Sequence, residues 1–188
     1  MSTVISTLRC DIAIRPAAEG DVAAYRDLRL EALRLHPEAF GADYASNLAE
    51  PPEYWITRLR QNTGDDGMIY FAEAGGSLVG MTGVRRGYAP KGWHNGLIWG
   101  VYVRPEWRGL KIAEALLGAC VDWARARGVR LVKLAVVTTN TAAIRCYTRC
   151  GFTVYGVEPE VLYYDGVYYD ELLMVRRILE TDRFDTKD

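Results

Sequence analysis

The chain has 188 residues, of which 49% are hydrophobic and 25% charged, and its formal net charge is -1. This length and composition are typical of one globular domain and exclude a largely disordered chain. The balanced charge argues against a nucleic-acid or membrane partner. The chain has no apolar run of 18 residues, and residues 1–10 lack the pattern of a signal peptide, so we expect a cytoplasmic protein.

The first half of the chain predicts a strand, two helices and three strands. Apolar and polar side chains alternate from Leu8 to Arg15, which is the period of a half-buried strand. Apolar residues then recur every three or four positions between Glu19 and His36, which indicates a helix ended by Pro37. A second helix is expected over residues 52–60. Strands are expected over residues 68–73, 78–86 and 97–103, with a hairpin turn at Gly75-Gly76.

The second half predicts helix, strand, helix and a terminal group of strands. The strongest amphipathic pattern lies between Gly109 and Gly128, and the run Leu131–Val137 is apolar enough for a central strand. A helix over residues 140–150 is followed by strands over 152–155, 161–164 and 168–175. This order indicates an α/β (α+β) fold with a mixed central sheet and helices on both faces. We expect one domain over residues 8–178, with flexible ends at 1–7 and 179–188.

The four cysteines (Cys10, Cys120, Cys146 and Cys150) stand at irregular spacings, which is typical of buried thiols rather than of a disulfide framework. Cys146 and Cys150 are four residues apart on an expected helix, but neither histidine of the chain lies near them in sequence. We therefore expect no metal site.

A turn between a strand and the long helix is suited to binding an anion. The first amides of a helix have no intrahelical partners and carry partial positive charge, so a diphosphate over residues 108–113 would receive several hydrogen bonds. Gly109 allows close approach, and Arg108 and Lys111 add side-chain cations. The alternative is an ordinary strand-loop-helix connection.

Two motifs give this chain a resemblance to a known family. Arg-Gly-Leu-Lys-Ile-Ala at 108–113 resembles the acetyl-CoA pyrophosphate loop of the GNAT superfamily, written R/Q-x-x-G-x-G/A. Lys111 stands where the family commonly has its middle glycine, and we expect it to adopt helical φ and ψ. The segment from Asn140 to Tyr147, followed by residues 149–152, resembles the second signature of the family. The resemblance covers about residues 10–176.

The resemblance implies a GNAT fold in which the strand at Trp99–Val103 carries a bulge and splays from Leu131–Val137. The slot between them would hold acetyl-CoA, with backbone amides near residues 101–103 as oxyanion donors. The implied cofactor-binding residues are Val101, Tyr102, Val103, Arg108, Gly109, Leu110, Lys111, Ile112, Ala113, Asn140 and Tyr147.

The implied activity is transfer of an acetyl group from acetyl-CoA to a primary amine of a small molecule or peptide, by direct attack in a ternary complex. Tyr147 is the expected catalytic residue, as proton donor to the departing thiolate. Tyr147 could instead be a core aromatic, and Asn140 a helix N-cap, a role compatible with ligand binding. A noncatalytic acyl-CoA-binding module is the alternative function.

The general base and the quaternary structure are less well defined by the sequence. Residues 97–100 offer no carboxylate at the strand position where many family members carry a glutamate, so Glu31, Asp170, Glu171 or a water relay are the candidates. The C-terminal strands are rich in tyrosine and could pair between subunits, which favours a homodimer.

Overall fold

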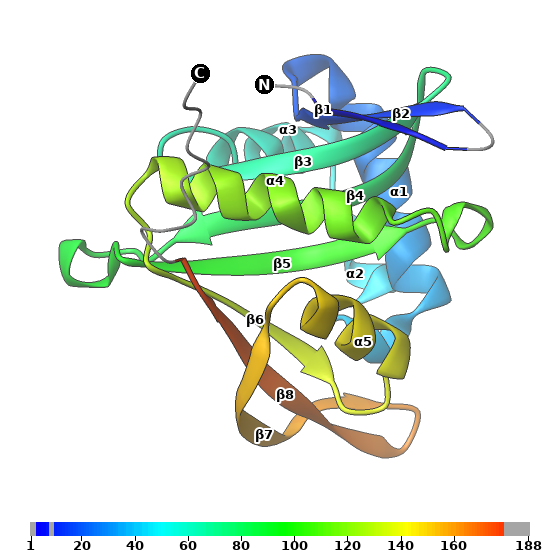
Figure 1. Ribbon diagram of the computed structural model, residues 1–188. Helices are drawn as coiled ribbons and strands as arrows, with labels where there is room; N and C mark the ends of the chain where they lie inside the picture. The colour runs from blue at the N-terminus through cyan, green and yellow to red at the C-terminus, as the bar shows by residue number, and fades with distance from the viewer. Residues whose placement is uncertain (1–2, 8–9, 179–188) are drawn as a thin grey trace, which may run out of the picture.

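A computed structural model describes residues 3–7 and 10–178, in which eight strands form one mixed sheet of order β1-β2-β3-β4-β5-β6-β8-β7 (Figure 1). The strands are β1 (Thr3–Ser6), β2 (Asp11–Pro16), β3 (Gly67–Ala74), β4 (Ser77–Arg86), β5 (Asn95–Val103), β6 (Leu131–Val137), β7 (Thr153–Tyr164) and β8 (Val167–Arg177). The α-helices are α1 (Val22–Leu35), α2 (Tyr44–Leu48), α3 (Pro52–Gln61), α4 (Ile112–Ala126) and α5 (Thr141–Arg149). Short 3-10 turns are η1 (Glu19–Asp21), η2 (Pro37–Ala39), η3 (Pro90–Gly92) and η4 (Pro105–Trp107).

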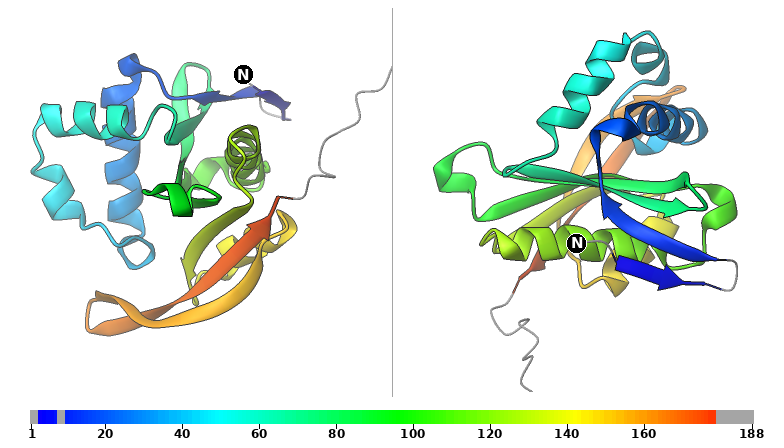
Figure 2. Two further views of the ribbon diagram at one scale, coloured as in Figure 1. Left: turned by 90° about the vertical axis from the view of Figure 1, so that its left-hand side faces the viewer. Right: turned by 90° about the horizontal axis from the view of Figure 1, so that it is seen from above.

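Helices cover both faces of the sheet, as the sequence predicted. Figure 2 shows α1 and α3 on one face and α4 on the other. The apolar stripe of α4, including Leu116, Leu117 and Cys120, is fully buried. On the opposite face, Tyr25 of α1 packs against Trp55 and Phe71. None of the helices in the described residues combines the length and apolarity that crossing a membrane requires.

The central strands β5 and β6 diverge. They are parallel and pair only from Asn95↔Leu131 to Leu97↔Lys133. Beyond that point β5 continues along β4, whereas β6 continues along β8 through its whole length. Figure 1 shows the resulting gap between the two ribbons. The predicted splay is therefore confirmed.

A bulge in β5 lies where the two strands have separated. Met81 pairs with Tyr102 and Gly83 with Trp99, so Gly100 and Val101 both lie opposite the single residue Thr82. Gly100 adopts the left-handed region (φ 67°), which a bulge of this kind requires and which glycine tolerates. The bulge expected in this strand is confirmed.

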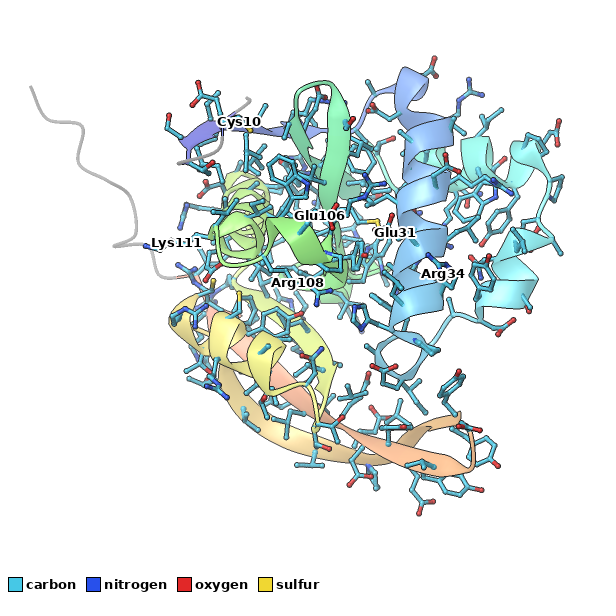
Figure 3. All side chains as sticks on the ribbon, turned by 90° about the vertical axis from the view of Figure 1, so that its right-hand side faces the viewer. Cys10, Glu31, Arg34, Glu106, Arg108 and Lys111 are labelled. Carbon is cyan, nitrogen blue, oxygen red and sulfur yellow. The ribbon has the colours of Figure 1, made fainter. Side chains whose placement is uncertain are left out.

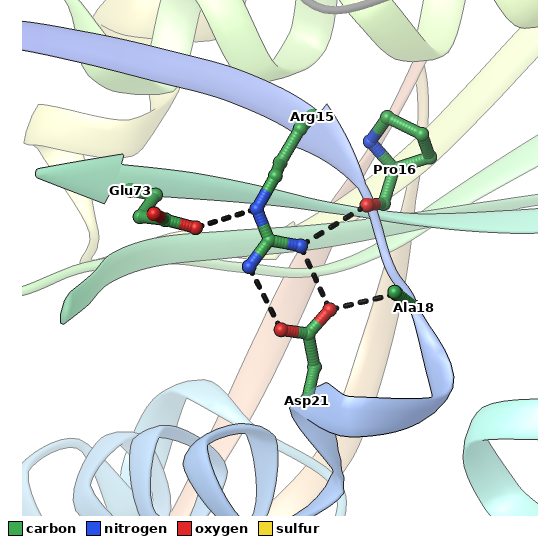
Figure 4. Close-up of polar contacts among 5 residues, drawn as sticks. All are labelled: Arg15, Pro16, Ala18, Asp21 and Glu73. Carbon is green, nitrogen blue, oxygen red and sulfur yellow. Dashed lines mark hydrogen bonds and ion pairs between the residues drawn. The ribbon is translucent and has the colours of Figure 1, made fainter. Parts of the chain in front are cut away.

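An ion-pair cluster fixes the start of α1 to the sheet (Figure 4). Arg15 of β2 donates to both carboxylate oxygens of Asp21, at 2.8 and 2.7 Å, and its Nε lies 2.5 Å from Glu73 of β3. Asp21 also accepts from the amide of Ala18 at 2.7 Å. Because α1 begins directly after Asp21, these contacts set the position of the helix.

Three parts of the structure differ from the sequence predictions. Thr3–Ser6 form β1 and pair with β2, so the sheet begins before the expected boundary at residue 8. The helix α2 was not predicted. The segments expected as separate strands at 152–155 and 161–164 belong to one strand, β7, whose pairing shifts register between Glu158 and Leu162. The kink at Glu160 (φ 53°) interrupts the side-chain alternation without ending the strand. Of the ends expected to be flexible, 1–7 and 179–188, residues 1–2 and 179–188 lie outside the described residues.

The cysteines are all free thiols. Cys120 and Cys146 are buried as expected, whereas Cys10 and Cys150 are only partly covered. The Cys146–Cys150 pair lies on α5 and its C-cap, next to Glu114 and Arg149 rather than to either histidine. A hydrogen bond with Cys150, together with burial, raises the pKa of Cys146, which keeps this thiol protonated.

Candidate active site

A cavity of about 710 Å³ occupies the gap between β5 and β6. Its walls are the bulged end of β5, the start of α4, the end of β6 and one face of α5. It is lined by ten of the eleven residues expected to bind the cofactor: Val101, Tyr102, Val103, Arg108, Gly109, Lys111, Ile112, Ala113, Asn140 and Tyr147. Leu110 is the exception, because its side chain packs against the buried cluster around Ile14 and Leu116. The structure thus brings together residues from three separate segments, whose roles in binding stay predictions.

The turn before α4 holds its shape through two left-handed residues. Gly109 has φ 81°, and Lys111, the N-cap of α4, has φ 59° and ψ 22°. The expectation that Lys111 adopts right-handed helical angles is wrong. A residue other than glycine is strained in this conformation by roughly 1–2 kcal/mol. Lys111 therefore takes the conformation suited to the glycine that the family motif has here, and α4 starts with its free amides at the cavity.

Arg108 does not extend freely into the cavity. Its Nε donates to the carbonyl of Val103 at 3.1 Å, and its Nη2 lies 2.8 Å from Nε2 of His36. A guanidinium has only donors, so Nε2 of His36 is the acceptor. Figure 3 shows Arg108 nearer to α1 than Lys111 is. Arg108 consequently ties the end of β5 to the segment that follows α1.

The helix α5 supplies Asn140 and Tyr147. Asn140 is the N-cap, and its Oδ1 accepts from the amide of Ala143 at 3.1 Å. Tyr147 is 8% exposed and packs edge to face on Phe152, while its ring lines the cavity. Burial raises the pKa of Tyr147 well above its ordinary value, so the phenol keeps its proton at neutral pH. Tyr147 is thus both a core aromatic and a wall of the cavity.

None of the three carboxylates considered as a base lines this cavity. Glu31 accepts from the Tyr102 hydroxyl at 2.8 Å and lies 3.2 Å from Arg104. Asp170 accepts from the amide of Glu160. Glu171 lies opposite Glu158 in the terminal hairpin, which is formed by β7 and β8, and burial raises the pKa of Glu171.

His36 and Glu38 line the cavity, and the sequence analysis missed both. Nδ1 of His36 lies 3.8 Å from Glu38, and its ring lies 6.1 Å from that of Tyr102. The only signal in the sequence was that His36 is one of two histidines and directly precedes Pro37. A separate cavity of about 980 Å³, between η1, α1 and α3, shares no lining residue with this site.

Comparison with known proteins gives consistent results. A model of the acetyltransferase (GNAT) family matches residues 22–152. The mycothiol acetyltransferase of Sanguibacter keddieii is 34% identical over 149 residues, which are 75% of this chain and 42% of that protein. This chain therefore spans less than half the length of that relative. The aminoglycoside N(6')-acetyltransferase type 1 of Stenotrophomonas maltophilia is 32% identical over 74% of this chain and 84% of its own.

Solved structures share the fold. The protein yncA of Salmonella typhimurium, solved with its cofactor acetyl-CoA, superposes with a TM-score of 0.79 over 94% of this chain and 99% of its own, at 22% identity. At this identity the likeness shows the arrangement of helices and strands alone. It agrees with the mixed sheet described above.

Proposed function

We propose that this chain, which belongs to the acetyltransferase (GNAT) family, transfers an acetyl group from acetyl-CoA to a primary amine of a small molecule or peptide. The observation that carries the proposal is the single cavity that joins the free amides of α4 to the bulge of β5 and to Tyr147. These features fit an acyl-CoA: a helix start suits a diphosphate, and a strand edge opened by the splay suits an amide-containing arm.

Each part of the cavity then has one task. The amides at the start of α4 hold the diphosphate, assisted by the exposed ammonium of Lys111, and Asn140 contacts the pantetheine arm. Acetyl-CoA supplies an acyl group activated as a thioester. Amides near Val101 stabilise the negative charge that develops on the acyl oxygen. Tyr147 holds its proton at neutral pH and donates it to the sulfur that departs.

The proton of the attacking amine leaves through water. Among the candidates named from the sequence, water remains, because Glu31, Asp170 and Glu171 do not line the cavity. Two carboxylates that do line it already have partners: Glu114 accepts from Arg149 at 2.6 Å, and Glu38 lies 3.8 Å from His36. Glu31 is also held by Tyr102 and Arg104, so its carboxylate serves to position the strand end. A cavity of about 710 Å³ has room for ordered water beside a bound cofactor arm.

The test separates binding from turnover. Calorimetry should detect association of the protein with acetyl-CoA, and CoA release should depend on an added amine. Tyr147→Phe should lower kcat by roughly 100-fold or more and change acetyl-CoA affinity little, because the ring and its packing remain. Tyr155→Phe, on the exposed face of β7, is the matched control and should be unchanged.

Three results would count against this reading. Absence of acetyl-CoA binding would refute the cofactor site. Unchanged turnover in Tyr147→Phe would remove Tyr147 from the chemistry. Binding without CoA release for any amine would favour the noncatalytic acyl-CoA-binding module. We also propose a homodimer formed through the terminal hairpin, and the cytoplasmic location expected from the sequence stays a prediction.

A further inference from the structure

Two arginines lie behind the wall of the cavity, and neither has an acidic partner within the described part of the chain. Arg29 of α1 is 5% exposed, and its Nε and Nη1 have no hydrogen-bond partner. Arg58 of α3 is partly buried and donates to the phenol oxygens of Tyr25 and Tyr54, both at 3.1 Å. Arg58 therefore donates only to neutral groups, and Arg29 makes no hydrogen bond within the described residues.

The two guanidinium groups lie against residues that line the cavity between β5 and β6. The Arg29 guanidinium stacks 4.8 Å from the centre of the Phe40 ring. Its Nη1 is so close to Gly100 that a Cβ added there would lie 3.7 Å away. The Arg58 guanidinium lies 5.7 Å from the centre of the Trp99 ring. Because Phe40, Trp99 and Gly100 all line the cavity, both cations lie immediately behind its wall at the bulge.

Such an arrangement is unfavourable for the protein alone. A buried charge without a partner destabilises the fold, and an apolar residue of similar volume would pack there more favourably. Burial, with a contribution from the charge of Arg58, lowers the pKa of Arg29 to about 10, which still leaves it charged at neutral pH. A site that holds unpaired buried cations is suited to an anion supplied from outside.

We propose that Arg29, assisted by Arg58, binds a carboxylate of the acceptor, so that the acceptor is a small molecule with an amine and a carboxylate, such as an amino acid. This inference rests on the proposed acetyltransferase function and names its substrate class. The amine and the carboxylate are separated by few bonds, because Gly100 belongs to the bulge that adjoins the acyl group. Polyamines and other polycations are disfavoured, because two arginines repel them.

Matched pairs of acceptors test the proposal. Each amino acid is compared with its amide and with the matching aminophosphonate, at equal concentrations of the neutral amine. Wild-type protein should use the amino acid at least about tenfold better than the amide, as kcat/KM, because charge-assisted hydrogen bonds to a buried carboxylate are lost with the amide. Equal use of acid and amide, or a preference for the phosphonate, would overturn the carboxylate assignment.

Variants assign that preference to one residue. In Arg29→Met, kcat/KM for the amino acid should fall at least about tenfold, while kcat/KM for the amide should change little. Arg34→Met, on the exposed part of the same helix (Figure 3), should retain the wild-type preference. A preference for the acid that survives in Arg29→Met would show that Arg29 does not hold the carboxylate.

Thermal unfolding gives a readout without turnover. The amino acid should raise the Tm of wild-type protein but not that of Arg29→Met, and the amide should raise neither. Arg29→Met without ligand should be as stable as wild type or more stable, since it removes a buried unpaired charge. Equal stabilisation by acid and amide would overturn the inference. Absence of CoA release with every acceptor would instead overturn the acetyltransferase proposal, and the unfolding measurement would still judge carboxylate binding.

Discussion

Lys111 is one of three residues other than glycine that have a positive φ in the described part of the chain, with Glu160 and Asp165. It occupies the left-handed region at the N-cap of α4, where a side chain costs about 1 kcal/mol or more. We predict that Lys111→Gly is more stable than Lys111→Ala by about 1 kcal/mol. This order reverses the one found inside helices, where alanine is the better residue. Urea unfolding of both variants measures the difference.

A control for this prediction lies in the same helix. Ala115→Gly, in the regular part of α4, should lose about 1 kcal/mol, which shows the ordinary order in the same background. An alanine variant at position 111 that is at least as stable as the glycine variant would contradict the strain assigned to Lys111. The affinity of Lys111→Gly for acetyl-CoA should fall only by the small amount expected from removing one exposed charge, because the amides of the turn remain.

At the scale of residues, the sequence predicted which residues lie together at the site, but not the contacts that position each side chain. Helical spacing placed Asn140 and Tyr147 on one side of a helix, and the resemblance of two motifs to the GNAT family placed Arg108 with them. The partner of Arg108 is His36, which lies 72 positions away, so no local pattern could indicate it. Arg29 and Arg58 look like ordinary charges of amphipathic helices in the sequence. Their burial depends on how α1 and α3 pack over β5, which local periodicity does not encode.

At the scale of elements, the ion pair of Arg15 and Asp21 joins α1 to the sheet. The side chain of Asp21 is 12% exposed, and the hydrogen bond from Arg15 lowers its pKa. A carboxylate with a lowered pKa stabilises the fold above its unfolded pKa of about 4, and this stabilisation is lost as pH falls through the folded value. We predict that Asp21→Asn lowers the free energy of unfolding by about 1–3 kcal/mol at pH 7.

The pH dependence distinguishes this pair from a general effect of the substitution. The difference between Asp21→Asn and wild type should shrink in urea unfolding near pH 3, because this carboxylate is then protonated more readily in the unfolded chain than in the folded state, where its pKa is lower. Asp122→Asn removes a 72% exposed partner of Arg125 and should change stability by less than about 1 kcal/mol at either pH. A loss in Asp21→Asn that is equal at both pH values would contradict the assigned role.

The elements that the sequence predicted well are those with a long, regular pattern. The helices α1 and α4 and the strands β3 to β6 follow from apolar periodicity and from glycine turns. The strand β1 and the helix α2 have four and five residues, too few for either period to be recognised. The splay of β5 from β6 followed only from the family resemblance, because strand register joins residues far apart in the chain.

At the scale of the whole molecule, the sheet ends in two edge strands of different character. The edge strand β1 is short, whereas β7 has twelve residues and, among the described strands, pairs on one side only, with β8. Apolar side chains on β7 and β8 are exposed, including Tyr155 at 53%, Val157 at 56% and Tyr168 at 61%. A long apolar edge is suited to pairing with another chain. The register shifts between Val154 and Gly156 and between Glu158 and Leu162 confine regular pairing in the first half of β7 to the residues around Val157.

We therefore predict that the protein sediments as a dimer and that Val157→Lys, on this half of β7, converts it to a monomer. A lysine at the edge opposes strand addition by charge repulsion and desolvation cost. Val4→Lys is the matched control, since Val4 is 59% exposed on the opposite edge strand β1 and should leave the dimer intact. Acetyl-CoA affinity should be the same in both variants, because neither residue lines the cavity between β5 and β6. A monomeric wild type, or a dimer that withstands Val157→Lys, would place the terminal hairpin outside any subunit contact and leave its exposed tyrosines to another role.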